Sequence, residues 1–185
     1  MSSVPRHLFM PETVRRNAYD DVPLPIGEGQ TISAPSMVAI MCDALDVRDG
    51  DKVLEVGTGL GYHAAVLSIL AGRGKVYTVE RKPELARRAR EIFEQLGFIN
   101  VEVITGDGTE GYLPQAPYDR ISVAAAAPDV PQPLVDQLKD NGRMVIPVGH
   151  YFQELYLVEK VDGNAHIHNR GGVAFVPLVG KYGFH

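Results

Sequence analysis

Short apolar runs alternate with longer amphipathic segments between residues 52 and 149, and this alternation constrains the fold more than any other feature. The predicted strands are "KVLEV" (52–56), "KVYTVE" (75–80), "VEVITGDG" (101–108), "DRISVAAAA" (119–127) and "RMVIPVG" (143–149). Helical patterns lie between most of them, in "HAAVLSILAG" (63–72), "KPELARRAREIFEQLG" (82–97) and "VPQPLVDQLKDNG" (130–142). The pattern predicts an α/β fold with a doubly wound, mainly parallel sheet.

The segments that flank this core are predicted to be of a different kind. At the C-terminal side, "QELYLVEKV" and "GGVAFVPLVG" are extended runs with no helix between them, and we expect them to pair as an antiparallel edge. An N-terminal extension precedes the first strand, and its first 21 residues are polar and irregular. "SAPSMVAIMCDAL" (33–45) is a predicted helix with Ser33 as a possible N-cap, whereas "VPLPIGEGQTISAP" (22–35) has the period of neither strand nor helix.

Composition excludes several classes of protein. The 185 residues suit one domain, spanning 1–185, and 45% hydrophobic with 22% charged residues is ordinary for a globular protein. The net charge of −5 argues against binding to nucleic acid or to a membrane surface. Cys42 is the only cysteine, so we expect a reducing compartment, and without a secretory signal the cytoplasm is the expected location. The six histidines form no ligand cluster, and no metal is expected.

A glycine-rich loop, "EVGTGLGYHAAV", follows the first predicted strand and opens a helix. Gly57, Gly59 and Gly61 alternate in it, and glycine lets a chain turn sharply and pass close beneath a ligand. Glu55 at the strand end would repel a pyrophosphate but can hold an amino group or a fixed water. The alternative is a plain tight turn between strand and helix.

Acidic residues end the next two predicted strands. Glu80 is placed to accept hydrogen bonds from ribose hydroxyls, although it could instead be a solvated acid that pairs with Arg81 or Lys82. Asp107 could accept from an exocyclic amine while Gly108 leaves room for a flat ring, or it could belong to a simple Asp-Gly turn. Together with the glycine loop, these strand ends describe a site for a nucleoside with an amino-acid-like tail, which is S-adenosylmethionine (SAM).

Segments along nearly the whole chain resemble one enzyme family. They are "VPRHLFMPE", "AYDDVPLPIGEGQTISAPSMVAIM", "VLEVGTGLGYHAAVL", "VYTVER", "GDGTEGY", "APYDRISVAAAAP" and "GGVAFVPLVGKYG". They look like protein-L-isoaspartate (D-aspartate) O-methyltransferase in its prokaryotic form. The resemblance implies a Rossmann-like class I SAM-dependent methyltransferase fold. It also implies that the enzyme methylates the free carboxyl of L-isoaspartyl residues in damaged proteins and peptides, with S-adenosyl-L-homocysteine as the product. A monomer is expected.

The resemblance also implies roles for individual positions. SAM would be bound by Glu55, Gly57, Gly59, Gly61, Glu80, Asp107 and Gly108. Ser33 is the residue implied as catalytic, and the substrate would be held by Gln30, Thr31, Ile32, Ala125, Ala126 and Pro128.

The chain departs from the family pattern at a few places. Leu60 stands where a small or polar residue is expected, and Ala174 and Val179 stand where Arg and Thr are expected. The helical segment that usually precedes "VPRHLF" is absent from this sequence. Two alternatives therefore stay open: another SAM-dependent methyltransferase, or a SAM-binding protein with weak or no catalysis.

Overall fold

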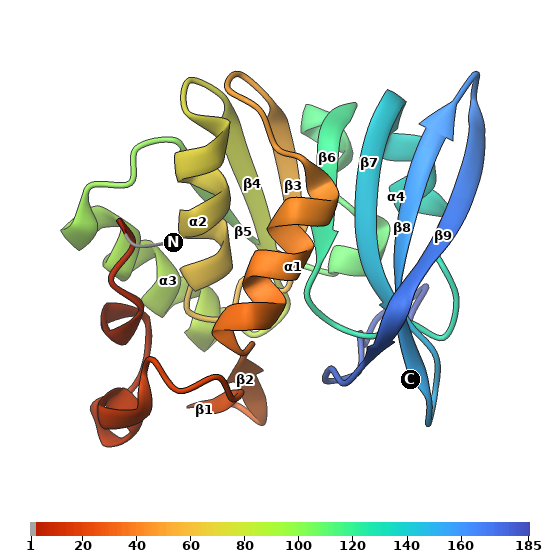
Figure 1. The fold of residues 1–185 in the computed structure, drawn as a ribbon. Helices are drawn as coiled ribbons and strands as arrows, with labels where there is room; N and C mark the ends of the chain where they lie inside the picture. Colours follow the sequence, from red (N-terminus) through yellow and green to blue (C-terminus); the bar gives the residue numbers. More distant parts are fainter. Residues whose placement is uncertain (1–2) are drawn as a thin grey trace.

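A computed structural model describes residues 3–185, and across this range a seven-stranded sheet forms the centre of the molecule (Figure 1). Its strands lie in the order β5–β4–β3–β6–β7–β8–β9. They span Lys52–Val56 (β3), Lys75–Glu80 (β4), Val101–Thr105 (β5), Tyr118–Val123 (β6), Leu138–Val148 (β7), Gln153–Val161 (β8) and Asn164–Val173 (β9). The five strands from β5 to β7 are parallel, and β8 and β9 are antiparallel. The predicted doubly wound sheet with an antiparallel edge is thus confirmed.

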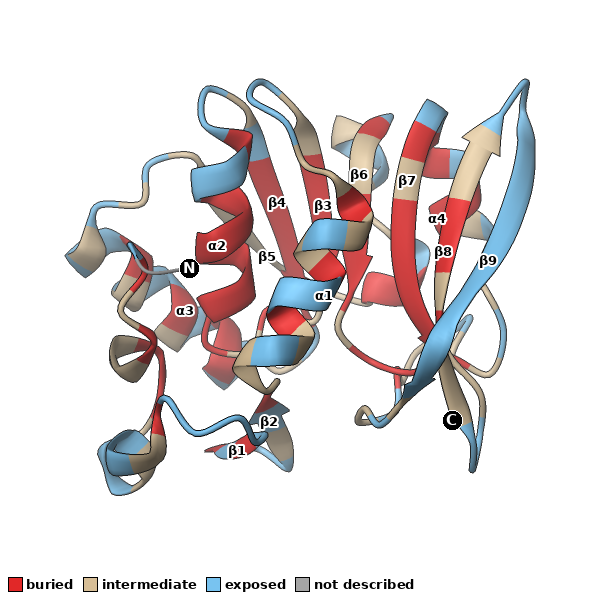
Figure 2. Cartoon of the chain, viewed as in Figure 1, coloured by how far each residue is buried: buried red, intermediate tan, exposed pale blue. Residues whose placement is uncertain are grey.

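Helices cover both faces of this sheet. The three longer ones, α1 (Pro35–Leu45), α2 (Tyr62–Ala71) and α3 (Pro83–Leu96), contribute to the same apolar core, and α4 (Gln132–Gln137) packs on the opposite face. Neighbouring residues of β3 alternate between the two cores, with Val53 in the first and Leu54 in the second. Figure 2 shows the central strands buried and β9 exposed along most of its length. No helix within residues 3–185 has the length and apolarity needed to span a bilayer.

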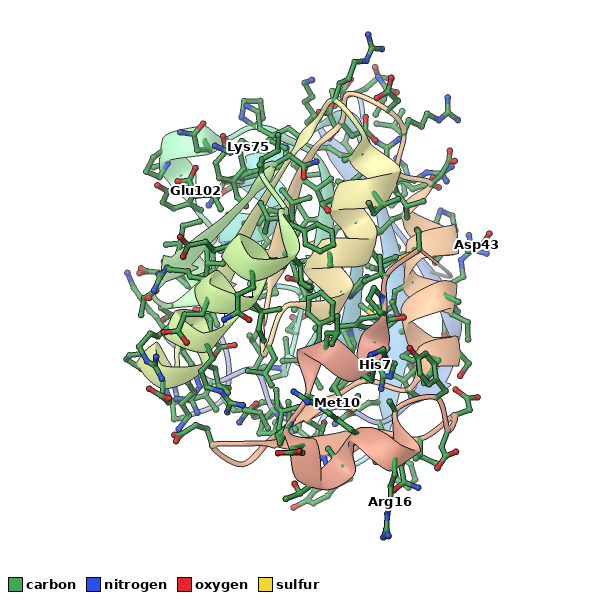
Figure 3. The ribbon with its side chains drawn as sticks, turned by 90° about the vertical axis from the view of Figure 1, so that its left-hand side faces the viewer. His7, Met10, Arg16, Asp43, Lys75 and Glu102 are labelled. Carbon is green, nitrogen blue, oxygen red and sulfur yellow. The ribbon has the colours of Figure 1, made fainter. Side chains whose placement is uncertain are left out.

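The first residues pack more closely than their polar composition predicts. Two 3₁₀ turns, η1 (Arg6–Phe9) and η2 (Glu12–Asn17), replace the irregular segment expected there, and Phe9 and Met10 are buried. The Arg6 guanidinium lies 4.9 Å above the ring of Tyr62, and its Nε donates to the carbonyl oxygen of Ala18 at 2.8 Å. Figure 3 shows these turns far from the labelled side chains of Lys75 and Glu102, which lie toward the other end of the sheet.

The prediction that residues 22–35 form no regular structure was wrong. The strands β1 (Leu24–Gly27) and β2 (Gln30–Ile32) pair as an antiparallel hairpin. Its turn uses positive φ angles of +51° at Glu28 and +69° at Gly29, and a bulge shifts the register after Pro25. The bulge and the proline break the two-residue period, which explains why the strands were missed.

A helix end, a strand partner and a helix N-cap also differ from the prediction. The helix expected over 130–142 ends at Gln137, because Leu138 already pairs with Tyr118 as the start of β7. β8 pairs with β9, so of the expected partner residues 171–180 only Gly172 and Val173 form ladder pairs, because an Asp162–Gly163 turn folds the chain back at once. Ser33 is not the N-cap of α1, since Ala34 holds that position and the carboxylate of Asp21 accepts from the Ser36 N–H.

Candidate active site

A cavity opens at the carboxyl ends of the parallel strands, beside the point where the chain order switches from β3 to β6. Ligands of open α/β sheets bind at such a switch point. Four segments form its walls: the β1–β2 hairpin with residue 33, the loop after β3, the ends of β4 and β6, and residues 176–179. Of the predicted site residues, those lining it are Gln30, Thr31, Ile32, Ser33, Gly57, Gly59, Glu80, Gly108 and Ala125.

The loop after β3 takes backbone angles that favour glycine. The φ angles are +96° at Gly57, +55° at Gly59 and +94° at Gly61. A Cβ at Gly59 would lie 3.0 Å from Cδ1 of Ile26, and one at Gly61 would overlap the ring of Phe93. Glycine at 59 therefore keeps the cavity open toward the hairpin, and glycine at 61 lets α2 pack against α3.

Glu80 links this loop to the neighbouring strand. Its side chain is largely buried at the end of β4, where Oε2 accepts from the Gly59 N–H and Oε1 accepts from the Lys82 N–H, both at 2.9 Å. Each carboxylate oxygen keeps a further lone pair, and the residue lines the cavity. Glu80 is therefore held in place as a hydrogen-bond acceptor with capacity left for a ligand.

The hairpin brings Thr31, Ile32 and Ser33 to the opposite wall. At its turn, Oε2 of Glu28 lies 4.0 Å from Nζ of Lys82 in a partly exposed ion pair. Within residues 3–185, the Ser33 hydroxyl forms no hydrogen bond, although the residue is only partly exposed. A hydroxyl in this state can donate to a group that enters the cavity.

Glu55 lies behind the cavity wall rather than in it. Burial raises the pKa of its carboxyl to about 8, although the hydrogen bond from the Thr78 hydroxyl acts in the opposite direction. The hydroxyls of Thr78 and Thr58 lie 2.6 Å apart, which connects Glu55 to the glycine loop. The carboxyl therefore supports the loop from the core.

Next to Glu55 lies His63, which does line the cavity. Burial lowers the pKa of His63 to about 4. His63 Nδ1 and Glu55 Oε1 are 3.7 Å apart, and Oε1 has no hydrogen-bond partner among residues 3–185. Because burial disfavours the charge on both groups, this contact joins a neutral imidazole to a neutral acid near pH 7.

The remaining predicted residues lie just outside the cavity lining. Asp107 accepts from the N–H and hydroxyl of Thr109 and from the N–H of Lys181, so it holds the C-terminal turn against the end of β5. Ala126 is buried and exchanges backbone hydrogen bonds with Val176 and Leu178. Pro128 is partly exposed two residues further on.

Comparison with known proteins decides the family. The family model described as "Protein-L-isoaspartate(D-aspartate) O-methyltransferase (PCMT)" matches residues 1–183. The chain belongs to this O-methyltransferase family.

Curated protein-L-isoaspartate O-methyltransferases are similar to this chain over nearly all of its residues. The protein-L-isoaspartate O-methyltransferase of Methanocella arvoryzae is 70% identical over 185 residues, which cover 100% of this chain and 98% of that protein. Protein-L-isoaspartate O-methyltransferase 2 of Archaeoglobus fulgidus is 63% identical, over 98% of this chain and 84% of that protein.

Solved methyltransferase structures share the fold. One protein-L-isoaspartate O-methyltransferase matches 97% of this chain with a TM-score of 0.91 at 31% identity, and this chain spans 60% of that one. A second, from Plasmodium falciparum and in complex with S-adenosyl-L-homocysteine, matches 96% of this chain and 87% of its own, with a TM-score of 0.86 at 28% identity.

Sequence reasoning left most of one wall of the cavity unassigned. Val176, Pro177 and Leu178 line the cavity, because the backbone of this segment is hydrogen-bonded to Ala126 after β6. An isolated bridge between Ala126 and Pro177 is too short to leave a strand period in the sequence. The signal was the apolar run "AFVPLV" itself, which was assigned to the sheet edge.

Two departures from the family pattern also lie at this site. Leu60 is buried and lines the cavity, and Val179 lines it beside Leu178. Leu60 adds apolar surface where a small or polar residue was expected, and Val179 does so where Thr was expected. Within residues 3–185, no group of three or more His, Cys, Asp or Glu side chains is arranged to hold a metal ion.

Proposed function

We propose that this chain transfers a methyl group from SAM to the free carboxyl of L-isoaspartyl residues in damaged proteins and peptides. The observation that carries the proposal is the convergence of Ser33, the glycine loop and Glu80 on one cavity. Family membership and the names of the close relatives support the same reaction. The SAH in the Plasmodium falciparum structure supports SAM as the methyl donor.

The cavity has the features that SAM requires. Glu80 offers fixed acceptors for ribose hydroxyls, and the loop from Gly57 to Gly59 passes close beneath the space. A Cβ at Gly108 would overlap Val56, so glycine there lets the segment after β5 pass close to the end of β3. We assign Gly57, Gly59, Glu80 and Gly108 to direct contact with SAM. The other assigned residues, Glu55, Gly61 and Asp107, lie at or behind the wall.

When bound, SAM supplies a methyl group on a positively charged sulfur, which is a good electrophile. The acceptor carboxyl has a reference pKa near 4 and is already ionised at pH 7, so the protein needs no strong base. Its task is to hold one carboxylate oxygen in line and to exclude water. Such orientation supplies roughly 7–11 kcal/mol of barrier reduction in the best cases.

Ser33 is the proposed catalytic group, as a hydrogen-bond donor and not as a nucleophile. Its hydroxyl is free to donate to the substrate carboxylate and aim it. Gln30, Thr31 and Ile32 on the hairpin and Ala125 across the cavity would hold the peptide around it. Ala126 and Pro128 would extend this surface beyond Ala125.

Methylation then allows repair without further help from the protein. The methoxy group of an ester leaves more readily than an oxygen of a free carboxylate. The neighbouring backbone nitrogen therefore attacks the ester carbonyl and closes a succinimide, while its proton and the methoxy group leave as methanol. Hydrolysis of the ring returns part of the material to normal aspartate.

The charge and the single cysteine of the chain bear on its partners and its location. The partners are isoaspartyl-containing proteins and peptides, with neither nucleic acid nor membrane expected of a chain with a net charge of −5. One chain supplies every wall of the cavity, which supports action as a monomer. A single cysteine, Cys42, is compatible with the reducing cytoplasm.

Calorimetry with SAM, followed by transfer of a radiolabelled methyl group to an isoaspartyl peptide, tests this function. We expect both binding and transfer. SAM binding without transfer would favour a non-catalytic SAM-binding protein. Transfer only to a small molecule or a nucleic acid would favour another class of methyltransferase.

A further inference from the structure

The connection between β7 and β8 presents two aromatic side chains to solvent. Tyr151 is 98% exposed and Phe152 is 92% exposed, so neither stabilises the core. The stretch from Gly149 to Gln153 contains no Asp, Glu, Lys or Arg. Aromatic side chains that gain nothing from folding are candidates for contact with a partner.

This connection has a fixed shape. Gly149 has φ +133° and lies so close to the carbonyl oxygen of Phe152 that a Cβ there would overlap it. The ring of His150 packs edge-on against Phe184, with 5.0 Å between the ring centroids. The aromatic pair is therefore presented by an ordered turn, which lowers the entropy lost on binding.

The turn is joined directly to the walls of the methyltransferase cavity. The Gly149 N–H donates to the carbonyl oxygen of Ala127 at 2.9 Å, and the Gln153 side chain forms hydrogen bonds with both backbone groups of Phe175. Ala127 and Phe175 lie within two residues of Ala125 and Val176, which line the cavity. Because β7 runs parallel to β3, the turn lies at the same edge of the sheet as the β1–β2 hairpin (Figure 1).

We propose that Tyr151 and Phe152 bind apolar side chains of the substrate polypeptide that flank its isoaspartyl residue. This inference rests on the function proposed above. An extended chain advances about 3.3 Å per residue, so a few residues reach from the cavity to its rim. Damaged proteins expose apolar segments when they unfold. Tyr151 and Phe152 would therefore bind such segments more tightly than fully polar ones.

Two other occupants fit this surface less well. Two side chains are far smaller than the roughly 800 Å² per partner of a stable protein interface, which disfavours a second copy of the chain. The turn has no Lys or Arg to meet anionic lipid, which disfavours a membrane. Because this turn is hydrogen-bonded to the cavity walls, its best-fitting partner is the polypeptide whose carboxyl enters the cavity.

The test uses the double variant Tyr151→Ser/Phe152→Ser and two isoaspartyl peptides of equal length. One peptide carries Leu and Phe two to five residues from the isoaspartyl position, and the other carries Ser and Gly there. The matched control is Ile99→Ser, since Ile99 is 96% exposed in the connection before β5, at the opposite edge of the sheet.

For the double variant, we expect KM for the apolar peptide to rise roughly tenfold, with kcat within about twofold. KM for the polar peptide and Kd for SAM should stay unchanged, as should all values for Ile99→Ser. An unchanged KM for the apolar peptide would overturn the inference while leaving the methyltransferase function intact. If the wild-type protein methylates neither peptide, the proposed function itself fails. A dimer in sedimentation that the double variant converts to a monomer would assign the surface to a second copy and overturn the inference.

Discussion

The backbone N–H of Gly59 donates a hydrogen bond of 2.9 Å to Oε2 of Glu80, and this bond joins the loop after β3 to the end of β4. The same carboxylate accepts from the Lys82 N–H through Oε1. One buried side chain thus fixes the glycine loop, starts the turn into α3 and faces the cavity. The geometry of the proposed SAM site depends on this residue before any ligand binds.

Replacing Glu80 with Gln should weaken SAM binding at least tenfold. An amide can accept with one oxygen only, so its NH₂ group would face either the Gly59 or the Lys82 N–H. A lost hydrogen bond of this kind typically costs about 1–3 kcal/mol. Calorimetry with SAM measures the effect, and Glu102→Gln is the control because the Glu102 carboxylate forms a surface ion pair with Lys75 and lies outside the cavity lining. Equal SAM affinity in both variants would contradict the role of Glu80.

Gly61→Ala should destabilise the protein more than Gly97→Ala. Both residues have positive φ angles, +94° and +74°, which cost an alanine roughly 1–2 kcal/mol. At Gly97 a Cβ meets nothing within 4 Å, whereas at Gly61 it overlaps the ring of Phe93, which adds about 1–3 kcal/mol. Urea unfolding of the two variants compares these losses. Equal losses would show that the contact between α2 and Phe93 is not close.

Stability should fall as the pH rises from about 6.5 to about 8. In this window the folded protein keeps Glu55 protonated, because burial raises its pKa to about 8, whereas the unfolded chain has already released that proton. The unfolded state then binds fewer protons, so the free energy of unfolding decreases, by roughly 2 kcal/mol across the window. Below pH 6.5, His63 acts in the opposite direction, since burial lowers its pKa to about 4.

The variant Glu55→Gln separates this effect from other titrations. It removes the carboxyl, keeps a neutral side chain of similar size, and should flatten the stability profile between pH 6.5 and 8. Urea unfolding at half-unit pH steps measures both proteins. A decline of the same size in Glu55→Gln would assign it to a different group.

The sequence predicts the centre of the fold better than its edges. Strands such as β3 and β4 are buried on both faces, so they appear in the sequence as mostly apolar runs. β9 was missed because almost all of its residues are exposed, so it has no apolar period. The Asp162–Gly163 turn was the available signal for that hairpin.

For the cavity too, the sequence predicts some lining residues and not others. Gly57, Gly59 and Glu80, which line the cavity, could be proposed from the sequence because strand ends and a glycine loop have local signals. Pro177 and Leu178 were not assigned to it, since their place in the cavity depends on long-range contacts such as the backbone hydrogen bond between Leu178 and Ala126, about fifty residues earlier. The buried state of Glu55 also depends on tertiary packing against Thr78 and His63, which a strand-end position does not reveal.

Ser33→Ala should lower kcat for methyl transfer at least about tenfold while Kd for SAM changes little. In the proposed mechanism the hydroxyl aims the substrate carboxylate, so its loss would remove an oriented donor at the reacting group. Ser36→Ala is the control, because Ser36 lies three residues away and outside the cavity lining. Steady-state rates with an isoaspartyl peptide, beside SAM calorimetry, give both quantities. A rate equal to that of the control would remove Ser33 from the mechanism.

The central claim is that the protein distinguishes an abnormal carboxyl from a normal one. The most direct measurement compares methyl transfer to two isomers of one peptide, identical except that a single residue is L-isoaspartyl in one and L-aspartyl in the other. We expect the isoaspartyl isomer to be methylated and the aspartyl isomer to remain at background. Equal methylation of both isomers would contradict the account.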